Sequence, residues 1–231
     1  MTTQTTDRPM TASTSTCDAG TRITRSLLGY GLLAGPVYVG ASVAQGLAHE
    51  GFDFGRHEWS LLAAGPYGWI QSANLVLTGL MCVAFAVGLR RALATGRAAT
   101  WSPRLVAVYG LGLIGAGVFR ADPRDGYPVG TPDGPGQVTW HGTLHFATAG
   151  IGFLAAVAAC FVLARRYAAE GRRGFAAYSA ATGVAFLAAF GGVASGGGSA
   201  AIIIAFTAAV VAQYGWLAVV AVDRYRTVAH Y

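Results

Sequence analysis

Six apolar blocks, each close to the length that spans a lipid bilayer, constrain this chain more than any other feature. They are about Ser26 to Ala48, Gly68 to Leu89, Pro103 to Phe119, Gly142 to Ala164, Phe175 to Ala194 and Ala201 to Val222. A helix rises about 1.5 Å per residue, so about 20 apolar residues cross roughly 30 Å of hydrocarbon. No block carries Asp, Glu or Arg in its interior, where a charge is costly. The sequence therefore predicts an all-α membrane bundle of six transmembrane helices.

The composition agrees with a membrane location and excludes other classes. Charged residues make up 11% of the chain, far below the roughly 25% of soluble domains. The net charge of +6 comes from arginines in short loops that form no continuous basic face, so no nucleic-acid partner is expected. The sequence has no phosphate-binding loop, dinucleotide fingerprint or Gly-x-Ser-x-Gly elbow. The expected partner is the lipid bilayer itself.

The arginines predict the orientation, because positive residues near helix ends mark the cytoplasmic side. One set of loops and tails contains Arg8, Arg22, Arg25, Arg90, Arg91, Arg97, Arg104, Arg165, Arg166, Arg172, Arg173, Arg224 and Arg226, and the other contains Arg56, Arg120 and Arg124. Both termini are therefore predicted to be cytoplasmic in a multi-pass protein of the inner (plasma) membrane. Basic residues that are all Arg, with abundant Ala and Gly, suggest a bacterial source.

The predicted organisation is a disordered cytoplasmic tail over residues 1–22, a six-helix domain over 23–224 and a short cytoplasmic tail over 225–231. The first apolar block has an alternative interpretation as a secretory signal cleaved near Ser42-Val43-Ala44. Cleavage would remove one helix and leave the rest of the topology unchanged. Glycines such as Gly31 and Gly110 predict close helix packing, either within one bundle or at a dimer seam.

Most side chains suited to chemistry fall in the predicted extracytoplasmic segments. His141 and His145 are spaced i, i+4 at the start of the fourth helix, a spacing that places two imidazoles on one face and allows them to share a metal ion. His57 or Asp122 is the candidate third ligand. A zinc ion with three protein ligands and an open position for water would suit hydrolysis.

The remaining candidates complete two alternative sites. Asp53 and Glu58 are the candidate general bases of a zinc hydrolase that acts on an amide or ester at the outer leaflet. Gln71 and Asn74, spaced i, i+3 near the outer end of the second helix, and Trp140 are the candidate ligand-binding residues. The alternatives to a metal site are a hydrogen-bonded cluster that links the loops and a ligand or proton pathway. The favoured function is binding of a lipid, small molecule or partner, and an assembly or sensor subunit is a third possibility.

Two loop motifs carry a resemblance to a known family. The first joins Phe52-Asp53-Phe54, His57, Ser60-Leu61, Gly65, Gly68-Trp69-Ile70-Gln71 and Asn74, and the second joins Phe119, Asp122-Pro123, Gly126-Tyr127-Pro128, Gly130-Thr131-Pro132 and Trp140 to His145. The stretch from about residue 27 to 222 resembles the DUF998 family of bacterial multi-pass membrane proteins. The resemblance implies the membrane architecture and names no reaction. The HxxxH spacing is also similar to that of alkaline ceramidases, without convincing Ser and His partners.

Overall fold

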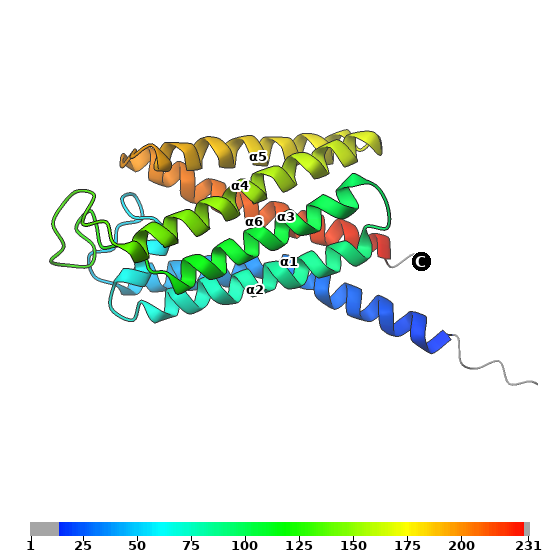
Figure 1. The fold of residues 1–231 in the computed structure, drawn as a ribbon, viewed down its shortest axis with the longest axis horizontal. Helices are drawn as coiled ribbons and strands as arrows, with labels where there is room; N and C mark the ends of the chain where they lie inside the picture. Colours follow the sequence, from blue (N-terminus) through cyan, green and yellow to red (C-terminus); the bar gives the residue numbers. More distant parts are fainter. Residues whose placement is uncertain (1–13, 229–231) are drawn as a thin grey trace, which may run out of the picture.

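The computed structural model describes residues 14–228, and they form an all-α bundle (Figure 1). The elements are α1 (Thr14–Ala48), the short 3-10 helix η1 (Trp59–Ala64), α2 (Trp69–Ala92), α3 (Arg97–Val118), α4 (Trp140–Ala169), α5 (Arg173–Ala194) and α6 (Ala200–Val228). No strand occurs among these residues. Helix α1 begins at Thr14, so residues 14–22, expected in a disordered tail, are helical. Residues 1–13 and 229–231 lie outside the described residues.

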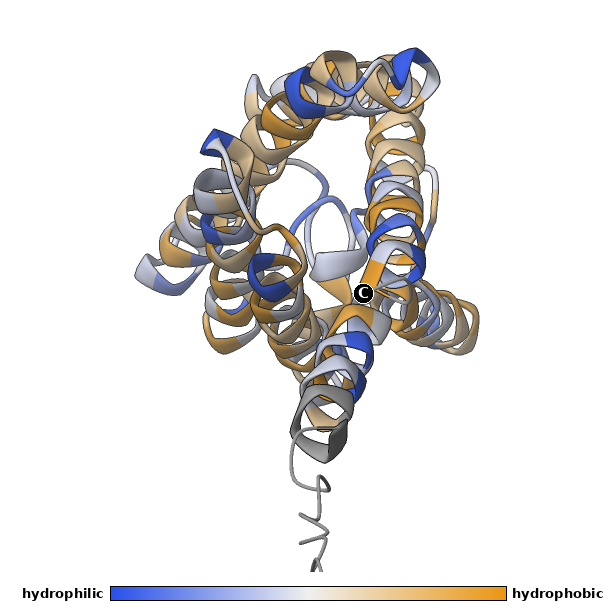
Figure 2. Ribbon diagram, turned by 90° about the vertical axis from the view of Figure 1, so that its right-hand side faces the viewer, coloured by the Kyte–Doolittle hydropathy of each residue, from blue (hydrophilic) through white to orange (hydrophobic). Residues whose placement is uncertain are grey.

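The six long helices form a ring in chain order. Each helix packs on the next one along the chain, and α6 returns to pack on α1. Figure 2 looks along the bundle and shows the helices placed around a common axis. No further long helix lies at the centre of the ring within residues 14–228, so side chains of the six helices surround that space. The ring therefore sets the position of any internal cavity.

Glycines allow α3 to approach both of its neighbours closely. A Cβ added at Gly110 would lie 2.6 Å from the Gly79 carbonyl oxygen on α2, and one at Gly112 would lie 2.7 Å from Gly152 Cα on α4. Small residues of this kind allow helices in lipid to pack backbone against backbone. Gly31, on α1, faces the ring of Phe85 on α2. Gly31, Gly110 and Gly112 thus each pack against a neighbouring helix of the same chain.

Five of the helices are long and apolar enough to cross a membrane: α1 from Ala19, α2, α4, α5 and α6. The chain is therefore a multi-pass membrane protein. Helix α3 differs because its first turns contain Arg97, Pro103 and Arg104, so its uncharged apolar stretch starts only at Leu105. Its glycines lower the hydropathy further. The predicted count of six spans is thus supported for five helices.

The two ends of the bundle differ in their polar residues. One end, called here the loop end, carries segments 49–68, 119–139 and 195–199, and the other, the arginine-rich end, carries the turns at 93–96 and 170–172 (Figure 1). Helix α2 starts with Trp69 at the loop end and reaches Arg90 and Arg91 at the other. The arginine-rich segments of the sequence therefore lie together at one end of the bundle, and the long loops lie at the other.

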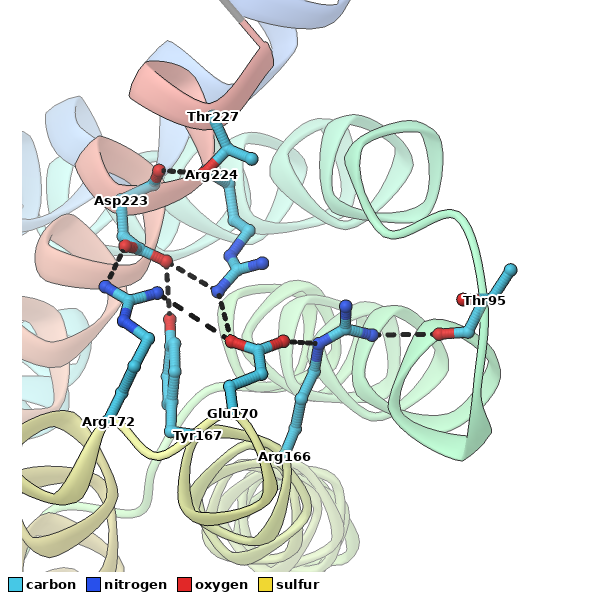
Figure 3. Close-up of polar contacts among 8 residues, drawn as sticks. All are labelled: Thr95, Arg166, Tyr167, Glu170, Arg172, Asp223, Arg224 and Thr227. Carbon is cyan, nitrogen blue, oxygen red and sulfur yellow. Dashed lines mark hydrogen bonds and ion pairs between the residues drawn. The ribbon is translucent and has the colours of Figure 1, made fainter. Parts of the chain in front are cut away.

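A network of ion pairs joins the helices at the arginine-rich end (Figure 3). Asp223 on α6 accepts a hydrogen bond of 3.0 Å from the Tyr167 hydroxyl on α4. The same carboxylate lies 2.7 Å from Nη2 of the buried Arg224 and forms an ion pair with Arg172 in the α4–α5 turn. The network therefore holds α6 against α4 and the α4–α5 turn, across one side of the ring.

The network extends towards the α2–α3 turn through Glu170. Its carboxylate lies 2.7 Å from Nε of Arg166 and 3.7 Å from Nη2 of Arg224. Arg166 donates a further hydrogen bond of 2.9 Å to the Thr95 carbonyl (Figure 3). The network thus connects the α2–α3 turn, the end of α4 and the end of α6 at the arginine-rich end.

Candidate functional site

His57 connects the two long loops at the loop end. Its Nδ1 accepts a hydrogen bond of 3.0 Å from the Asp53 backbone N–H, so its Nε2 carries the proton and donates to the Asp125 carbonyl at 3.0 Å. The ring is buried and lies 5.5 Å from the ring of Tyr127. Both ring nitrogens are therefore occupied by backbone groups, and neither has a lone pair left for a metal ion.

The carboxylates of Asp53 and Asp122 stabilise the loops around them. Asp53 Oδ1 accepts a hydrogen bond of 2.7 Å from the Gly55 N–H. Asp122 accepts hydrogen bonds from the Thr139 N–H at 2.7 Å and the Thr139 hydroxyl at 2.6 Å. Thr139 in turn caps the first turn of α4 by accepting from the Gly142 N–H. These contacts explain why a short polar side chain suits each position.

The two histidines of the i, i+4 pair lie in different environments. His141 is exposed, and its ring lies against that of the exposed Trp140, with centroids 3.7 Å apart and planes tilted by 34°. His145 is buried, and its Nδ1 lies 2.8 Å from the carbonyl oxygens of both Ala116 and Phe119. His145 is therefore hydrogen-bonded inside the bundle at the end of α3, while His141 lies at the surface beside Trp140.

The predicted metal ligands do not come together. Among residues 14–228, no three His, Cys, Asp or Glu side chains lie close enough to hold a metal ion. The proposed ligand set of His57, Asp122, His141 and His145 is therefore not grouped in this geometry: His57 and Asp122 are hydrogen-bonded within the loops, and His145 is hydrogen-bonded at the end of α3. The geometry therefore offers no support for a zinc hydrolase.

Gln71 and Asn74, predicted to bind a ligand, form hydrogen bonds that connect two helices. Asn74 Nδ2 donates to the Tyr38 carbonyl at 3.1 Å, and Gln71 Nε2 donates to the Ser42 hydroxyl at 3.1 Å. All of these side chains are buried between α1 and α2. Interhelical hydrogen bonds of this kind satisfy polar groups in lipid. Trp140, the third predicted ligand residue, lies at the surface, as aromatic residues at a membrane interface commonly do.

A cavity of about 470 Å³ lies inside the ring towards the loop end. Its walls are mainly apolar and aromatic, and its lining includes Tyr38, Tyr109, Phe153, Phe206 and Tyr214. Ring centroids of Tyr38 and Tyr214 are 5.1 Å apart. Cavities of this size that combine apolar walls with a few polar groups are typical ligand sites. Exposed residues such as Val138 and Phe146 also belong to the lining, so the cavity reaches the surface.

The cavity lining includes four carboxylate, guanidinium or imidazole side chains. Asp122 is bonded to Thr139, and the other three, Glu58, Arg124 and His145, form a group where the cavity meets the loops. We call this group the polar mouth. Glu58 is buried and forms an ion pair with Arg124, which is partly exposed and lies 3.8 Å from Asp125. Glu58 Oε1 is buried and has no hydrogen-bond partner among the described residues. The cavity thus has an apolar interior and one polar end.

The loop motifs and the helices around this cavity coincide with a family model. Residues 32–223 match the family described as "Protein of unknown function (DUF998)". The chain belongs to the DUF998 family. No curated protein and no solved structure matches it. The family match covers both loops of the polar mouth, α2 to α5 in full, α1 from residue 32 and α6 up to residue 223. It supports the resemblance seen in the loop motifs.

Sequence reasoning found part of this DUF998 site and missed the rest. Of the polar mouth, Glu58 and His145 were candidates, whereas Arg124 was counted only for topology. The aromatic cavity walls, such as Tyr109 and Tyr214, were not identified, because an aromatic residue inside an apolar block has the same pattern whether it packs in a core or lines a cavity. The run Arg124-Asp125 beside a turn-forming loop was the one signal available.

Proposed function

We propose that this protein binds an amphiphilic lipid, or a small molecule built like one, in the cavity at the loop end. The observation that carries the proposal is the combination of an apolar, aromatic interior with the polar mouth of Glu58, Arg124 and His145. An apolar tail would lie between the helices of the ring. A polar head would lie against the mouth, beneath the two long loops.

The topology that accompanies this proposal has six spans, with both termini in the cytoplasm of a bacterial cell and the cavity on the extracytoplasmic side of the plasma membrane. Helix α3 packs along α2 and α4 and joins the arginine-rich end to the loop end, which supports its role as the sixth span. The gathering of arginines such as Arg90 and Arg166 at one end supports the orientation.

The polar mouth is the part of the site that would give selectivity. A lipid tail gains little by moving from the bilayer into an apolar cavity, because lipid tails are as apolar as the side chains that replace them. Hydrogen bonds and ion pairs to the head are different, since buried polar groups without partners cost free energy. The shape of the cavity would therefore limit which tails it can hold, and the polar contacts to the head would determine the binding affinity.

A cavity-filling substitution tests the proposal. Ala149 on α4 is buried and lines the cavity, so Ala149→Phe places a ring in the space a tail would use. The matched control is Ala185→Phe on the exposed face of α5. We expect native mass spectrometry of gently solubilised protein to find retained lipid in the parent and in the control, and a loss of at least tenfold in Ala149→Phe. Absence of retained lipid from all three, or equal retention in all three, would contradict the proposal.

A further inference from the structure

Two hydrogen-bond acceptors of the polar mouth lack a donor, and His145 carries the first of them. The carbonyl oxygens of Ala116 and Phe119 are acceptors only, so Nδ1 of His145 must carry the proton that it shares with them at 2.8 Å. In the neutral ring, Nε2 then keeps its lone pair. No hydrogen-bond partner for Nε2 exists in the described part of the chain, and His145 lines the cavity.

Glu58 supplies the second acceptor. One of its oxygens, Oε2, faces the Arg124 guanidinium. The other, Oε1, is buried without a partner, although the side chain lines the cavity and is more than nine-tenths buried. A buried carboxylate oxygen in this condition lacks a donor that would offset its desolvation. Nearby, the indole N–H of Trp59 is a buried donor without a partner, suited to an ester or hydroxyl oxygen.

We infer that the head of the bound lipid carries hydrogen-bond donors, as a hydroxyl or ammonium group does, and is not a bare phosphate. This inference rests on the proposed function and names the class of its ligand. Oε1 of Glu58 is buried without a donor, and Nε2 of His145 has no hydrogen bond within residues 14–228, whereas the cation of the mouth, Arg124, already has Glu58 as its partner. A phosphate would add further acceptors and leave both atoms unsatisfied. An ammonium or hydroxyl would satisfy them.

The test compares lipids with the same acyl chains and different heads on the purified full-length protein. The probes are phosphatidylethanolamine, whose ammonium donates, diacylglycerol, whose hydroxyl donates, and phosphatidylcholine and phosphatidic acid. Phosphatidylcholine has a quaternary nitrogen that cannot donate. We expect at least one of the two donor lipids to bind about tenfold more tightly than phosphatidylcholine and phosphatidic acid, since hydrogen bonds to charged or buried groups carry factors of this size. Which of the two binds best distinguishes the ammonium from the hydroxyl.

A variant locates the preference at the polar mouth. Glu58→Gln replaces the carboxylate, and the matched control is Glu50→Gln, an exposed position in the same loop. We expect Glu58→Gln to lose the preference for the donor lipid while its affinity for phosphatidylcholine is unchanged, and Glu50→Gln to keep both. The series on the parent protein is informative even where the variant does not fold.

The outcomes separate this inference from the function on which it rests. Binding of all four lipids with equal affinity, or tightest binding of phosphatidic acid, would overturn the donor inference and leave lipid binding intact. Binding of none of the four, together with no retained lipid, would overturn the proposed function. A donor preference that survives Glu58→Gln would also overturn the assignment to this mouth.

Discussion

Adding one methyl group at Gly112 should disrupt the packing of α3 against α4. A Cβ at this position would lie 2.7 Å from both Gly152 Cα and the Thr148 carbonyl oxygen, whereas ordinary contact begins at 3.4 Å. All of these neighbours are backbone atoms, so no side-chain rotation can relieve the clash. The two helices must move apart, and the close contacts along the whole seam lengthen with them.

The size of the effect follows from two opposing terms. Overpacking a tight contact costs about 1–3 kcal/mol, while replacing glycine by alanine in a helix gains about 0.5–1 kcal/mol. The clash is with backbone atoms at 2.7 Å, so its cost lies in the upper part of this range, at about 2–3 kcal/mol. Gly112→Ala should therefore lower the free energy of unfolding by about 1–2.5 kcal/mol, or the melting temperature by about 2–10 °C for a chain of this size. The matched control is Gly40→Ala on α1, where an added Cβ meets nothing within 4 Å.

The assay is thermal unfolding of purified protein in one detergent, followed by circular dichroism. Gly40→Ala should melt at or above the temperature of the parent, because it keeps the helix gain without a clash. If Gly112→Ala has the same melting temperature as Gly40→Ala, then α3 and α4 do not approach as closely as the contact between Gly112 and Gly152 requires. That result would refute the reasoning.

Two further predictions concern the arginine-rich end and the orientation. Asp223→Asn should destabilise the protein by about 3 kcal/mol, because the buried Arg224 guanidinium then has only the more distant Glu170 carboxylate as a partner. Arg166→Gln, in a partly exposed i, i+4 pair, should cost about 0.5 kcal/mol. Equal shifts in chemical unfolding would contradict the difference. The orientation is tested with single cysteines introduced at the exposed positions Val129 and Thr95 in a Cys17→Ser background. A membrane-impermeant maleimide should label Val129→Cys in intact cells and Thr95→Cys only after permeabilisation. Labelling of both in intact cells would refute the orientation.

The sequence predicted the helices well because their signal is local. The blocks ending near Ala48 and Ala194 end there in the structure, and the loop before Trp140 precedes a helix as expected. Helix α3 is the instructive exception. Its glycines were expected to promote packing, but the same residues, with Arg104, reduce the hydropathy by which a span is recognised.

The site was harder to predict because it depends on which side chains meet across the ring. The spacing of His141 and His145 places two rings on one helical face. His145 nevertheless contacts the carbonyl groups of Ala116 and Phe119 at the end of α3, whereas His141 lies beside the rings of Trp140 and Phe119. The pairing of Glu58 with Arg124 joins loops separated by two helices. No local pattern in the sequence encodes such contacts.

The circular order of the helices has a consequence for biogenesis. Each helix finds its partner immediately before it in the chain, so α1 to α5 can pack one after another as they leave the ribosome and enter the lipid. The exception is the contact between α6 and α1, whose two partners are the first and last spans to be made. The cavity inside the ring is therefore completed only when translation is nearly finished, because α6 supplies part of its wall. A chain that stops short of α6 would leave the row of helices open on one side in the bilayer.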